Sequence, residues 1–339
     1  MKKTLISIIM VNYNGKTFIG KNELRDAISS FLETKYAPLE FIFVDNNSND
    51  DSVKFAEKIF EDYKSLSTKI IRNENNLGFA GGCEEGLKSA RGRYIVLVNN
   101  DNKVVDPNWL VKFIRVLEQN DNIGAVFCKT IKWDEPTLLD SKGLTMTPPG
   151  LMAMTDIPED KISECLVWQT PVMFRREITN KIGGFFDRDY VILNDDTDSS
   201  IRIWLAGYRI LYVPTVFALH KRSATMKNLP TEFVCFHGRK NTIQTLIKNY
   251  EMKNLIRWLP VTLIIYLAAI VYFLFKKRVD QAKATLYAIL WNIKNSGRIM
   301  KKRRYIQKNV RRTSDDVIFR LMRLFNLMEV IRGEKIWPK

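Results

Sequence analysis

The sequence predicts an α/β protein with a mostly parallel sheet covered by helices on both faces, followed by a C-terminal helical region. Apolar runs that end in polar residues alternate with helical patterns over the first 130 residues. A long uncharged stretch then follows late in the chain, with basic residues on both sides. A length of 339 residues with 46% hydrophobic content suits one large domain with appendages.

The strand at Tyr94–Asn99 carries the clearest signal, because a β-branched apolar run of this kind is typical of a central strand buried on both faces. The predicted strands of this region are Leu5–Asn12, Leu39–Asp45, Thr68–Arg72, Tyr94–Asn99 and Gly124–Ile131. The helices predicted between them are Leu24–Glu33, Asp51–Leu66, Gly82–Ala90 and Asn108–Gln119.

Residues 133–164 contain four prolines and predict a long irregular loop or flap. After it we expect a strand at Leu166–Phe174, a helix at Asp198–Ala206 and a strand at Tyr208–Val213, with Gly207 just past the end of the helix. The apolar start of the chain superficially resembles a signal peptide. It lacks a small-residue cleavage site, so a first strand is the better interpretation.

The stretch Trp258–Phe275 has no charge and reaches the lower length limit of a transmembrane helix. Pro260 lies inside it, and basic residues at both ends would place one basic flank on the wrong side of a membrane. We therefore expect a monotopic or re-entrant helix. Residues 276–339 hold 18 Lys and Arg against five Asp and Glu, which predicts a tail on anionic lipid headgroups. A buried core or dimer helix is the alternative, and nucleic acid is not an expected partner.

Cysteine and histidine usage excludes several classes of protein. The four cysteines form no close pair, which argues against a zinc cluster or a disulfide framework and fits a reducing compartment. The two histidines are too few for a His-rich metal site.

Polar residues follow four successive predicted strands, and one of these segments is a glycine-rich turn that enters a helix. Ligands of open α/β sheets bind outside the carboxyl ends of the strands, and glycine lets the backbone approach a phosphate closely. Each motif alone also makes ordinary turns, but together they predict a nucleotide cradle. Asp101 ends the fourth strand, where a carboxylate can hold a divalent metal against phosphates.

Three acids, Asp195, Asp196 and Asp198, stand at a predicted helix start. Capping and the helix dipole favour acids there, which is the structural alternative. Three carboxylates in four residues exceed what capping needs. Their repulsion should raise the pKa of at least one, as a general base for a sugar hydroxyl requires.

In this order, the motifs resemble glycosyltransferase family 2, the inverting GT-A class, and especially its rhamnosyltransferase-like branch. The resemblance covers roughly residues 4–250. The stretches that carry it are Ile8–Gly15, Val44–Ser52, Asn76–Gly82, Leu97–Asp101, Lys181–Phe185, Asp195–Asp198, Leu205–Arg209 and Val213–Pro214.

The resemblance implies a donor site in which Asp45, with Asn12 and Asn14 nearby, contacts the base and ribose of a nucleotide. The segment Gly78–Gly82 would close over the nucleoside. The full set of implied donor-binding residues is Asn12, Asn14, Asp45, Asn76, Gly78, Phe79, Gly81 and Asn100.

It also implies that Asp101 coordinates Mg²⁺ or Mn²⁺ on the donor diphosphate and that Asp196 is the base that deprotonates the acceptor hydroxyl. His220 matches a position that supplies a further metal or phosphate contact in some members, and a packed loop histidine is an equal alternative. Three departures are Asp195 in place of the usual Glu, Asn102 where Thr is common, and Cys83-Glu84-Glu85 where Asn is frequent. The Gln-x-x-Arg-Trp signature of processive synthases is absent from the sequence, which favours transfer of one sugar per encounter.

These implications predict transfer from a UDP-, GDP- or dTDP-linked sugar to a lipid-linked saccharide at the cytoplasmic face of a membrane. A second copy of the chain, in a homodimer, is a candidate partner, and the sequence leaves the oligomeric state open. The expected division of the chain is a catalytic domain at 1–222, a helical extension at 223–254, a hydrophobic segment at 255–278 and a basic tail at 279–339. Alternatives are a polyprenyl-phosphate sugar synthase and a non-catalytic sugar-nucleotide scaffold. A nucleotidyltransferase is disfavoured because Asn12-Tyr13-Asn14-Gly15 lacks a basic glycine-rich loop.

Overall fold

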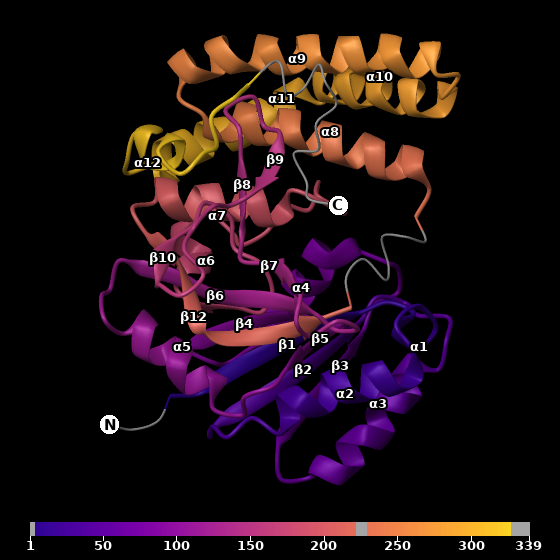
Figure 1. The fold of residues 1–339 in the computed structure, drawn as a ribbon, viewed down its shortest axis with the longest axis vertical. Helices are drawn as coiled ribbons and strands as arrows, with labels where there is room; N and C mark the ends of the chain where they lie inside the picture. The colour runs from indigo at the N-terminus through magenta and orange to yellow at the C-terminus, as the bar shows by residue number, and fades with distance from the viewer. Residues whose placement is uncertain (1–3, 222–228, 327–339) are drawn as a thin grey trace.

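A ten-stranded mixed sheet forms the centre of the computed structural model, which describes residues 4–221 and 229–326 (Figure 1). The main path of the sheet has the order β10-β12-β6-β11-β4-β1-β2-β3, with β5 paired to β12 and β7 paired to β6. The strands of the sheet are β1 Ile6–Asn12, β2 Leu39–Asp45, β3 Ser67–Arg72, β4 Tyr94–Asn99, β5 Asn102–Val104, β6 Ile123–Lys132, β7 Leu139–Ser141, β10 Ser163–Glu164, β11 Val172–Arg175 and β12 Arg209–His220. A separate two-stranded sheet contains β8 Leu144–Met146 and β9 Met152–Met154.

Strand direction brings the polar strand ends to one edge of the sheet. β1 runs parallel to both β2 and β4, and β6 runs parallel to β12. β11 lies antiparallel between β4 and β6, so these two neighbours point the same way. The carboxyl ends of β1, β2, β4, β6 and β12 therefore lie at the same edge, which is where ligands of open α/β sheets bind.

Both faces of the sheet are buried, as the apolar strands predict. In β1, Ile8 and Met10 pack into a core with helices α2 and α5, whereas Ile9 and Val11 pack on the other face with α4 and α7. This arrangement confirms the predicted α/β fold class. The helices of this part are α1 Gly15–Phe18, α2 Lys21–Leu32, α3 Ser52–Phe60, α4 Gly78–Ser89, α5 Trp109–Leu117, α6 Ile178–Lys181 and α7 Asp195–Leu205, with a 3₁₀ turn at Glu61–Tyr63.

Several boundaries differ from the sequence-based expectation. α7 begins at Asp195, three residues early, because Asn194 turns the chain in a left-handed conformation and the helix dipole favours the acids in the first turn. β12 extends to His220 past Pro214, since a register shift between Tyr212 and Phe217 accommodates the proline. The region 133–164 contains four short strands, β7 to β10, rather than irregular chain alone.

The C-terminal helices stack above the sheet on the side of α7, and α9 and α10 run side by side at the top of Figure 1. Their bounds are α8 Thr231–Asn249, α9 Met252–Phe275, α10 Val279–Lys294, α11 Ser296–Tyr305 and α12 Asp316–Phe319, with a π-helical turn at Ile306–Val310. The chain then folds back onto α7, where the Arg312 amide donates to the Leu205 carbonyl at 2.7 Å. Ile306, Val310 and Ile318 belong to the same core as Ile9.

A buried ion cluster fastens α8 and α11 to the loop before α7. The Lys248 ammonium lies 2.6 Å from Asp187 and 2.9 Å from Asp198. Lys302 of α11 pairs with the same Asp187 and, at 2.7 Å, with Asp189. Burial alone would raise the pKa of Asp187, but the two lysines outweigh it and hold that pKa well below its usual range.

We expect Lys302→Met to lower the free energy of unfolding by about 1–3 kcal/mol, because it removes charged hydrogen bonds from the partly buried carboxylates of Asp187 and Asp189 while keeping the apolar stem. The neighbouring exposed Lys301 gives a matched control, and Lys301→Met should change stability by less than about 0.5 kcal/mol. Urea unfolding at pH 7 measures both. A low folded-state pKa stabilises the protein above the unfolded pKa of about 4, so the contribution of Lys302 should fade as the pH drops below about 4. Equal stability of the two variants at pH 7 would contradict the role of the cluster.

Candidate active site

A cleft of about 640 Å³ lies at the edge where the carboxyl ends of the strands meet. Its wall combines the ends of β1, β4 and β12, the start of α4, the β8–β9 hairpin, the segment 191–197 and the start of α8. Polar and charged residues gather on the strand ends, whereas the hairpin and α8 contribute apolar side chains. The cleft therefore has one polar side and one apolar side.

The ends of β1, β2 and β4 form a hydrogen-bonded layer behind this wall. The Asn12 amide donates to the Asp45 carboxylate at 2.9 Å, and the Asn100 amide donates to the Asn12 oxygen at 2.8 Å. Asp45 also accepts the Ser48 hydroxyl at 2.6 Å and is only 3% exposed. The side-chain oxygen of Asn14 accepts the Asn49 amide at 2.7 Å. These bonds fix the turns that follow β1 and β2.

The glycine-rich turn needs glycine at Gly78. This residue has φ +71°, and a Cβ there would lie 2.0 Å from the Val191 carbonyl oxygen. The Gly78 carbonyl accepts the Asn46 amide at 2.8 Å, and its N–H donates to Asn76 at 2.9 Å. The turn is thus held between the end of β2 and the segment that leads to α7.

Asp101, His220 and Asp140 form a chain of charged groups on the polar side. His220 Nε2 lies 3.5 Å from Asp101 Oδ1, and His220 Nδ1 lies 2.8 Å from Asp140 Oδ2. Asp140 also accepts the Thr130 hydroxyl at 2.9 Å. Burial lowers the pKa of His220, but the two carboxylates outweigh it and raise that pKa to about 10.

This set fits a divalent cation that is shared with a phosphate ligand. Among the described residues no group of three His, Cys, Asp or Glu side chains is arranged to hold a metal. Asp101 offers an oxygen, and His220 would offer Nε2 after a bound metal displaces its proton, since metal-binding histidine must be neutral. Asp140 would then orient the imidazole as outer-sphere carboxylates do at metal sites. Mg²⁺ typically takes only one or two protein carboxylates and completes its shell with phosphates and water.

The three acids of α7 have different environments. Asp198 is buried, yet Lys248 and Arg202 outweigh that burial and lower its pKa. Asp195 and Asp196 pair with no cation in the described part of the chain and line the cleft. Burial raises the pKa of both, and the charge of Asp196 adds to the effect at Asp195. Hydrogen bonds from Thr197 oppose the rise at Asp196 without cancelling it. Burial, rather than repulsion alone, is the main cause.

The structure brings most of the predicted site residues to one cleft. Those that line it are Asn76, Gly78, Phe79, Asn100, Asp101, Asp196 and His220. Asn12, Asn14, Asp45 and Gly81 are not in its lining; the first three lie in the layer behind it, and Gly81 lies in the first turns of α4. The roles assigned to all of these residues stay predictions.

Sequence reasoning missed Asp140, Tyr13, Asn46 and Gln169, which also line the cleft. Asp140 lies in the region expected to be irregular, and only the pairing of β7 with β6 places it beside His220. Gln169 donates to the Cys128 and Ser141 carbonyls at 3.0 and 3.1 Å and so joins β6 to β7. Asn46 could have been predicted, because it lies within the motif Val44–Ser52, whereas no sequence pattern around Asp140 indicates a site residue.

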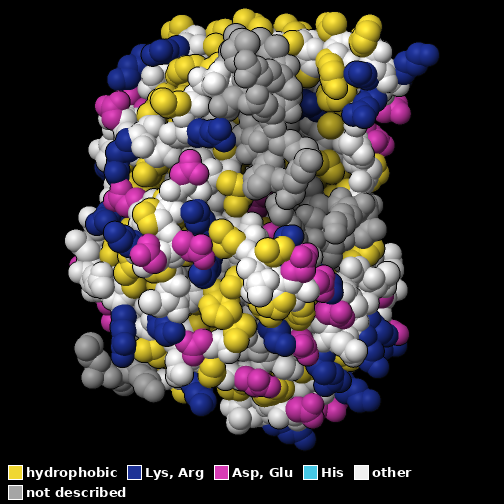
Figure 2. Space-filling view, in the orientation of Figure 1, with side chains coloured by type: hydrophobic (Ala, Val, Ile, Leu, Met, Phe, Trp, Pro, Cys, Tyr) yellow, Lys and Arg dark blue, Asp and Glu magenta, His cyan; other side chains and the backbone are white. Residues whose placement is uncertain are grey.

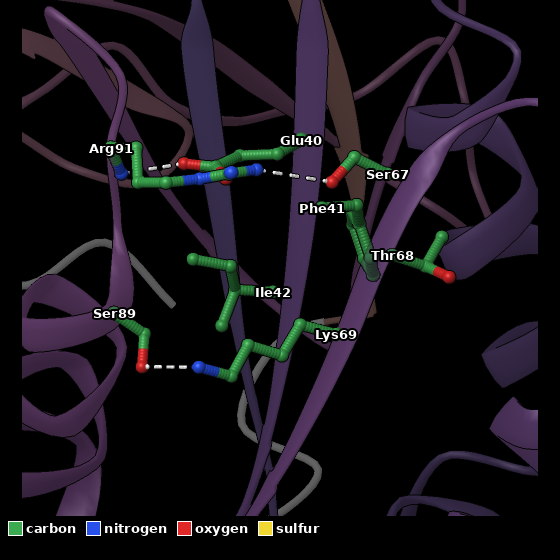
Figure 3. A pocket seen from close by; sticks show the side chains of 8 residues that line it. All are labelled: Glu40, Phe41, Ile42, Ser67, Thr68, Lys69, Ser89 and Arg91. Carbon is green, nitrogen blue, oxygen red and sulfur yellow. Dashed lines mark hydrogen bonds and ion pairs between the residues drawn. The ribbon is translucent and has the colours of Figure 1, made fainter.

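A second cavity, of about 350 Å³, lies at the opposite ends of β2 and β3 (Figure 3). Its charged groups bond to one another: Arg91 Nε donates to Glu40 at 3.0 Å, and Lys69 donates to Ser89 at 3.0 Å. Burial raises the pKa of Glu40, but bonds from Ser7 and Arg91 outweigh it and leave that pKa lowered. Because the charged groups of this cavity already have hydrogen-bond partners within the protein, we interpret it as a structural feature and not as a second ligand site.

Comparison with known proteins shows a family match and several relatives. The family model described as "Glycosyl transferase family 2" matches residues 7–183. An uncharacterized glycosyltransferase of Methanocaldococcus jannaschii is 31% identical over 211 residues, which are 62% of this chain and 68% of that protein. An uncharacterized glycosyltransferase of Haemophilus influenzae is 27% identical over 198 residues, 56% of this chain and 58% of that protein.

Other relatives are longer or more distant. The O-antigen biosynthesis protein RfbC of Myxococcus xanthus is 25% identical over 60% of this chain but only 16% of its own length. Among solved structures, GalNAc-T7 with UDP, GalNAc and Mn²⁺ has a TM-score of 0.60 at 14% identity, over 87% of this chain and 58% of that chain. Staphylococcus aureus TarS 1-349 with UDP-GlcNAc has a TM-score of 0.59 at 14% identity, over 97% and 92%.

The likeness to these solved structures shows that the sheet and its helices have the GT-A fold. The family match extends over more than half of the chain, and the archaeal relative exceeds 30% identity over two thirds of its length. This chain belongs to glycosyl transferase family 2.

Proposed function

We propose that this chain is an inverting, metal-dependent glycosyltransferase that moves one hexosyl or rhamnosyl residue from a nucleotide-diphosphate sugar to a hydroxyl of a lipid-linked saccharide. The proposal rests on one observation: Asp101, at the end of β4, and Asp196, at the start of α7, line the same cleft. A single bound substrate can therefore meet both carboxylates. The solved structure of GalNAc-T7 contains UDP and that of TarS 1-349 contains UDP-GlcNAc, which supports a nucleotide-sugar donor for this chain.

In this proposal Asp196 takes the proton of the acceptor hydroxyl as its oxygen attacks the anomeric carbon. The new carbon–oxygen bond forms as the bond to the nucleoside diphosphate breaks, and attack from the opposite face inverts the configuration. Burial favours this role, because a carboxylate with a raised pKa is a stronger base. Asp101 and His220 would hold Mg²⁺ or Mn²⁺, which when bound neutralises charge on the leaving diphosphate.

The proposal of a lipid-linked acceptor is supported by the apolar side of the cleft. Met152 and Met154 of β9, Leu229 and Phe233 at the start of α8, and Trp168 line it. The far side of α8 packs against α9 and α10. The cleft is thus separated by one helix from the apolar surface described next, which favours an acceptor whose lipid stays in a bilayer.

Membrane binding would use an apolar surface made by α9 and α10, which we call the platform. α9 is the one helix among the described residues that is long and apolar enough to cross a membrane. Its exposed apolar side chains recur at helical spacing, and α10 continues the same surface. The exposed apolar residues of the platform are Ile256, Ile264, Leu267, Val271, Tyr272, Leu274, Phe275, Val279, Leu286, Tyr287, Leu290 and Ile293. Figure 2 shows hydrophobic side chains along the upper edge, with Lys and Arg at both ends.

The contacts of α9 favour a helix that lies in the membrane plane. Thr262 is fully buried and donates to the Pro149 carbonyl at 2.8 Å, and Leu255 and Tyr266 are also buried. The Arg239 guanidinium lies 5.2 Å from the Phe273 ring centre, near the other end of the helix. A helix held by protein along one side cannot be surrounded by lipid. We infer a monotopic enzyme on the anionic cytoplasmic face.

We expect Asp196→Asn to lower kcat by about 10³-fold while donor binding persists, since the amide cannot accept the proton. Sugar transfer and donor affinity are measured with UDP-N-acetylglucosamine, GDP-mannose and dTDP-rhamnose in the presence of Mn²⁺. The exposed Asp62 provides a control, and Asp62→Asn should leave kcat unchanged. Full turnover by the Asp196 variant would reject Asp196 as the base, whereas donor binding without transfer by the wild type would leave a binding scaffold as the alternative. Comparing a polyprenyl phosphate with a lipid-linked saccharide as acceptor separates the synthase alternative.

A second prediction concerns the metal. UDP, GDP or dTDP should raise Tm in the presence of Mn²⁺, because a ligand that binds the native state stabilises it by mass action. Chelation with EDTA or the change Asp101→Asn should remove most of this shift. Equal nucleotide stabilisation with EDTA and with Mn²⁺ would contradict a metal held by Asp101.

A third prediction concerns the platform. The double change Leu267→Glu and Val271→Glu should abolish sedimentation with vesicles of phosphatidylcholine and phosphatidylglycerol, because it places two charges on the apolar face. Val105 and Ile162 are exposed apolar residues outside the platform, so Val105→Glu and Ile162→Glu should sediment like the wild type. Unchanged sedimentation of the Leu267/Val271 variant would reject the platform as the membrane site.

A further inference from the structure

The segment that leads into α7 has an unfavourable backbone. Leu193 and Asn194 have φ values of 63° and 61°, the left-handed region that residues other than glycine rarely adopt. Such a conformation is unfavourable and persists only where the surroundings hold it. These two residues come directly before Asp195 and Asp196, so the conformation of this segment decides where the acids point.

Helix α8 holds this segment from behind. The side-chain amide of Asn241 donates to both the Ile192 and the Leu193 carbonyl oxygens, each at 2.7 Å. Thr242 is the next residue of α8, and its Oγ1 accepts a hydrogen bond from the Asn194 side-chain amide at 3.0 Å. Two adjacent residues of α8 therefore bind the three residues that precede the acids.

Asn241 is poorly explained by stability alone. Its side chain is fully buried, and its Oδ1 accepts no hydrogen bond from any described residue. A buried unpaired acceptor is unfavourable, and an apolar residue of similar size would avoid it but would leave the Ile192 and Leu193 carbonyls without this donor. What Asn offers here is its two N–H donors. Turning the amide over would place Oδ1 against two carbonyl oxygens, which would repel it.

We propose that Asn241 is a positioning residue that sets the direction of Asp196 through the 192–194 segment. Asn241 does not line the cleft, so it acts through the backbone rather than on the substrate. This inference rests on the proposed role of Asp196 as the base. It assigns to α8, which lies beyond the residues matched by the family model, a part in the chemistry of the active site.

A matched control comes from the next helix. Asn292 of α10 is also a buried Asn, and its amide donates to two carbonyls, those of Lys240 at 3.1 Å and Ala288 at 2.9 Å. Its Oδ1 likewise lacks a partner among the described residues. Asn292 binds α8 from the platform side and makes no hydrogen bond to the segment 192–194.

We expect Asn241→Leu to lower kcat by 10- to 100-fold while KM for the donor changes less than twofold, since a misplaced base slows the chemical step without removing donor contacts. Asn292→Leu should keep wild-type kcat even where it lowers Tm by a similar amount. Both are assayed well below their Tm, with whichever of UDP-N-acetylglucosamine, GDP-mannose or dTDP-rhamnose the wild type turns over fastest. Thr242→Val is a milder second variant and should lower kcat in the same direction.

Hydrogen exchange provides a measurement that does not depend on the substrate. Asn241→Leu should speed amide exchange in residues 190–197, whereas Asn292→Leu should leave that segment unchanged. If Asn241→Leu has the wild-type kcat and the wild-type rate of amide exchange in residues 190–197, the positioning role is wrong, while the proposed glycosyltransferase function still stands. Full activity of Asp196→Asn would instead overturn the base itself, so the two failures can be told apart.

Discussion

The contact of Lys248 with Asp187 and Asp198 is the interaction on which the C-terminal half of the molecule depends. The lysine side chain is 1% exposed, and its distances to the two carboxylates are 2.6 and 2.9 Å. A buried cation of this kind is stable only with its partners, because either charge alone would be costly to remove from water. The cluster fixes α8 against α7. It also gives the acids of α7 different surroundings. Asp198 is paired with a cation, whereas Asp195 and Asp196 line the cleft and pair with no cation among the described residues.

Sheet topology supplies the other half of the site. Because β11 reverses direction between β4 and β6, the ends of β4 and β12 reach the same edge and place Asp101 beside His220. Several polar residues of the motifs, such as Asn12 and Asp45, bond mainly to one another and shape the turns. Other residues of the same motifs, such as Asn76 and Asp101, line the cleft itself. The motifs at the strand ends therefore contain both supporting residues and residues that line the cleft, and local sequence does not separate the two groups.

Local patterns predicted the first half of the fold well, since β1, β2 and β4 follow from short apolar runs with clear polar ends. They also singled out Asp101 and Asp196, and both line the cleft. The rest depends on contacts between distant residues. Asp140 reaches His220 only through the pairing of β7 with β6, and Asn241 meets Leu193 across 48 residues. Counting charge in the basic tail likewise could not reveal that Lys302 binds inside the protein.

Helix α8 links the two surfaces that the proposed reaction needs. At its start, Phe233 lines the cleft; in its middle, Asn241 holds the segment before the acids; and its outer side packs against α9 and α10. If the platform rests on a bilayer, the acceptor lipid and the catalytic cleft are held within one helix of each other. Restricting the acceptor in this way removes much of the translational entropy of meeting it. Under the proposed function, the polar side of the cleft would bind the soluble nucleotide sugar and the apolar side the membrane-bound acceptor, and α8 would set the distance between them.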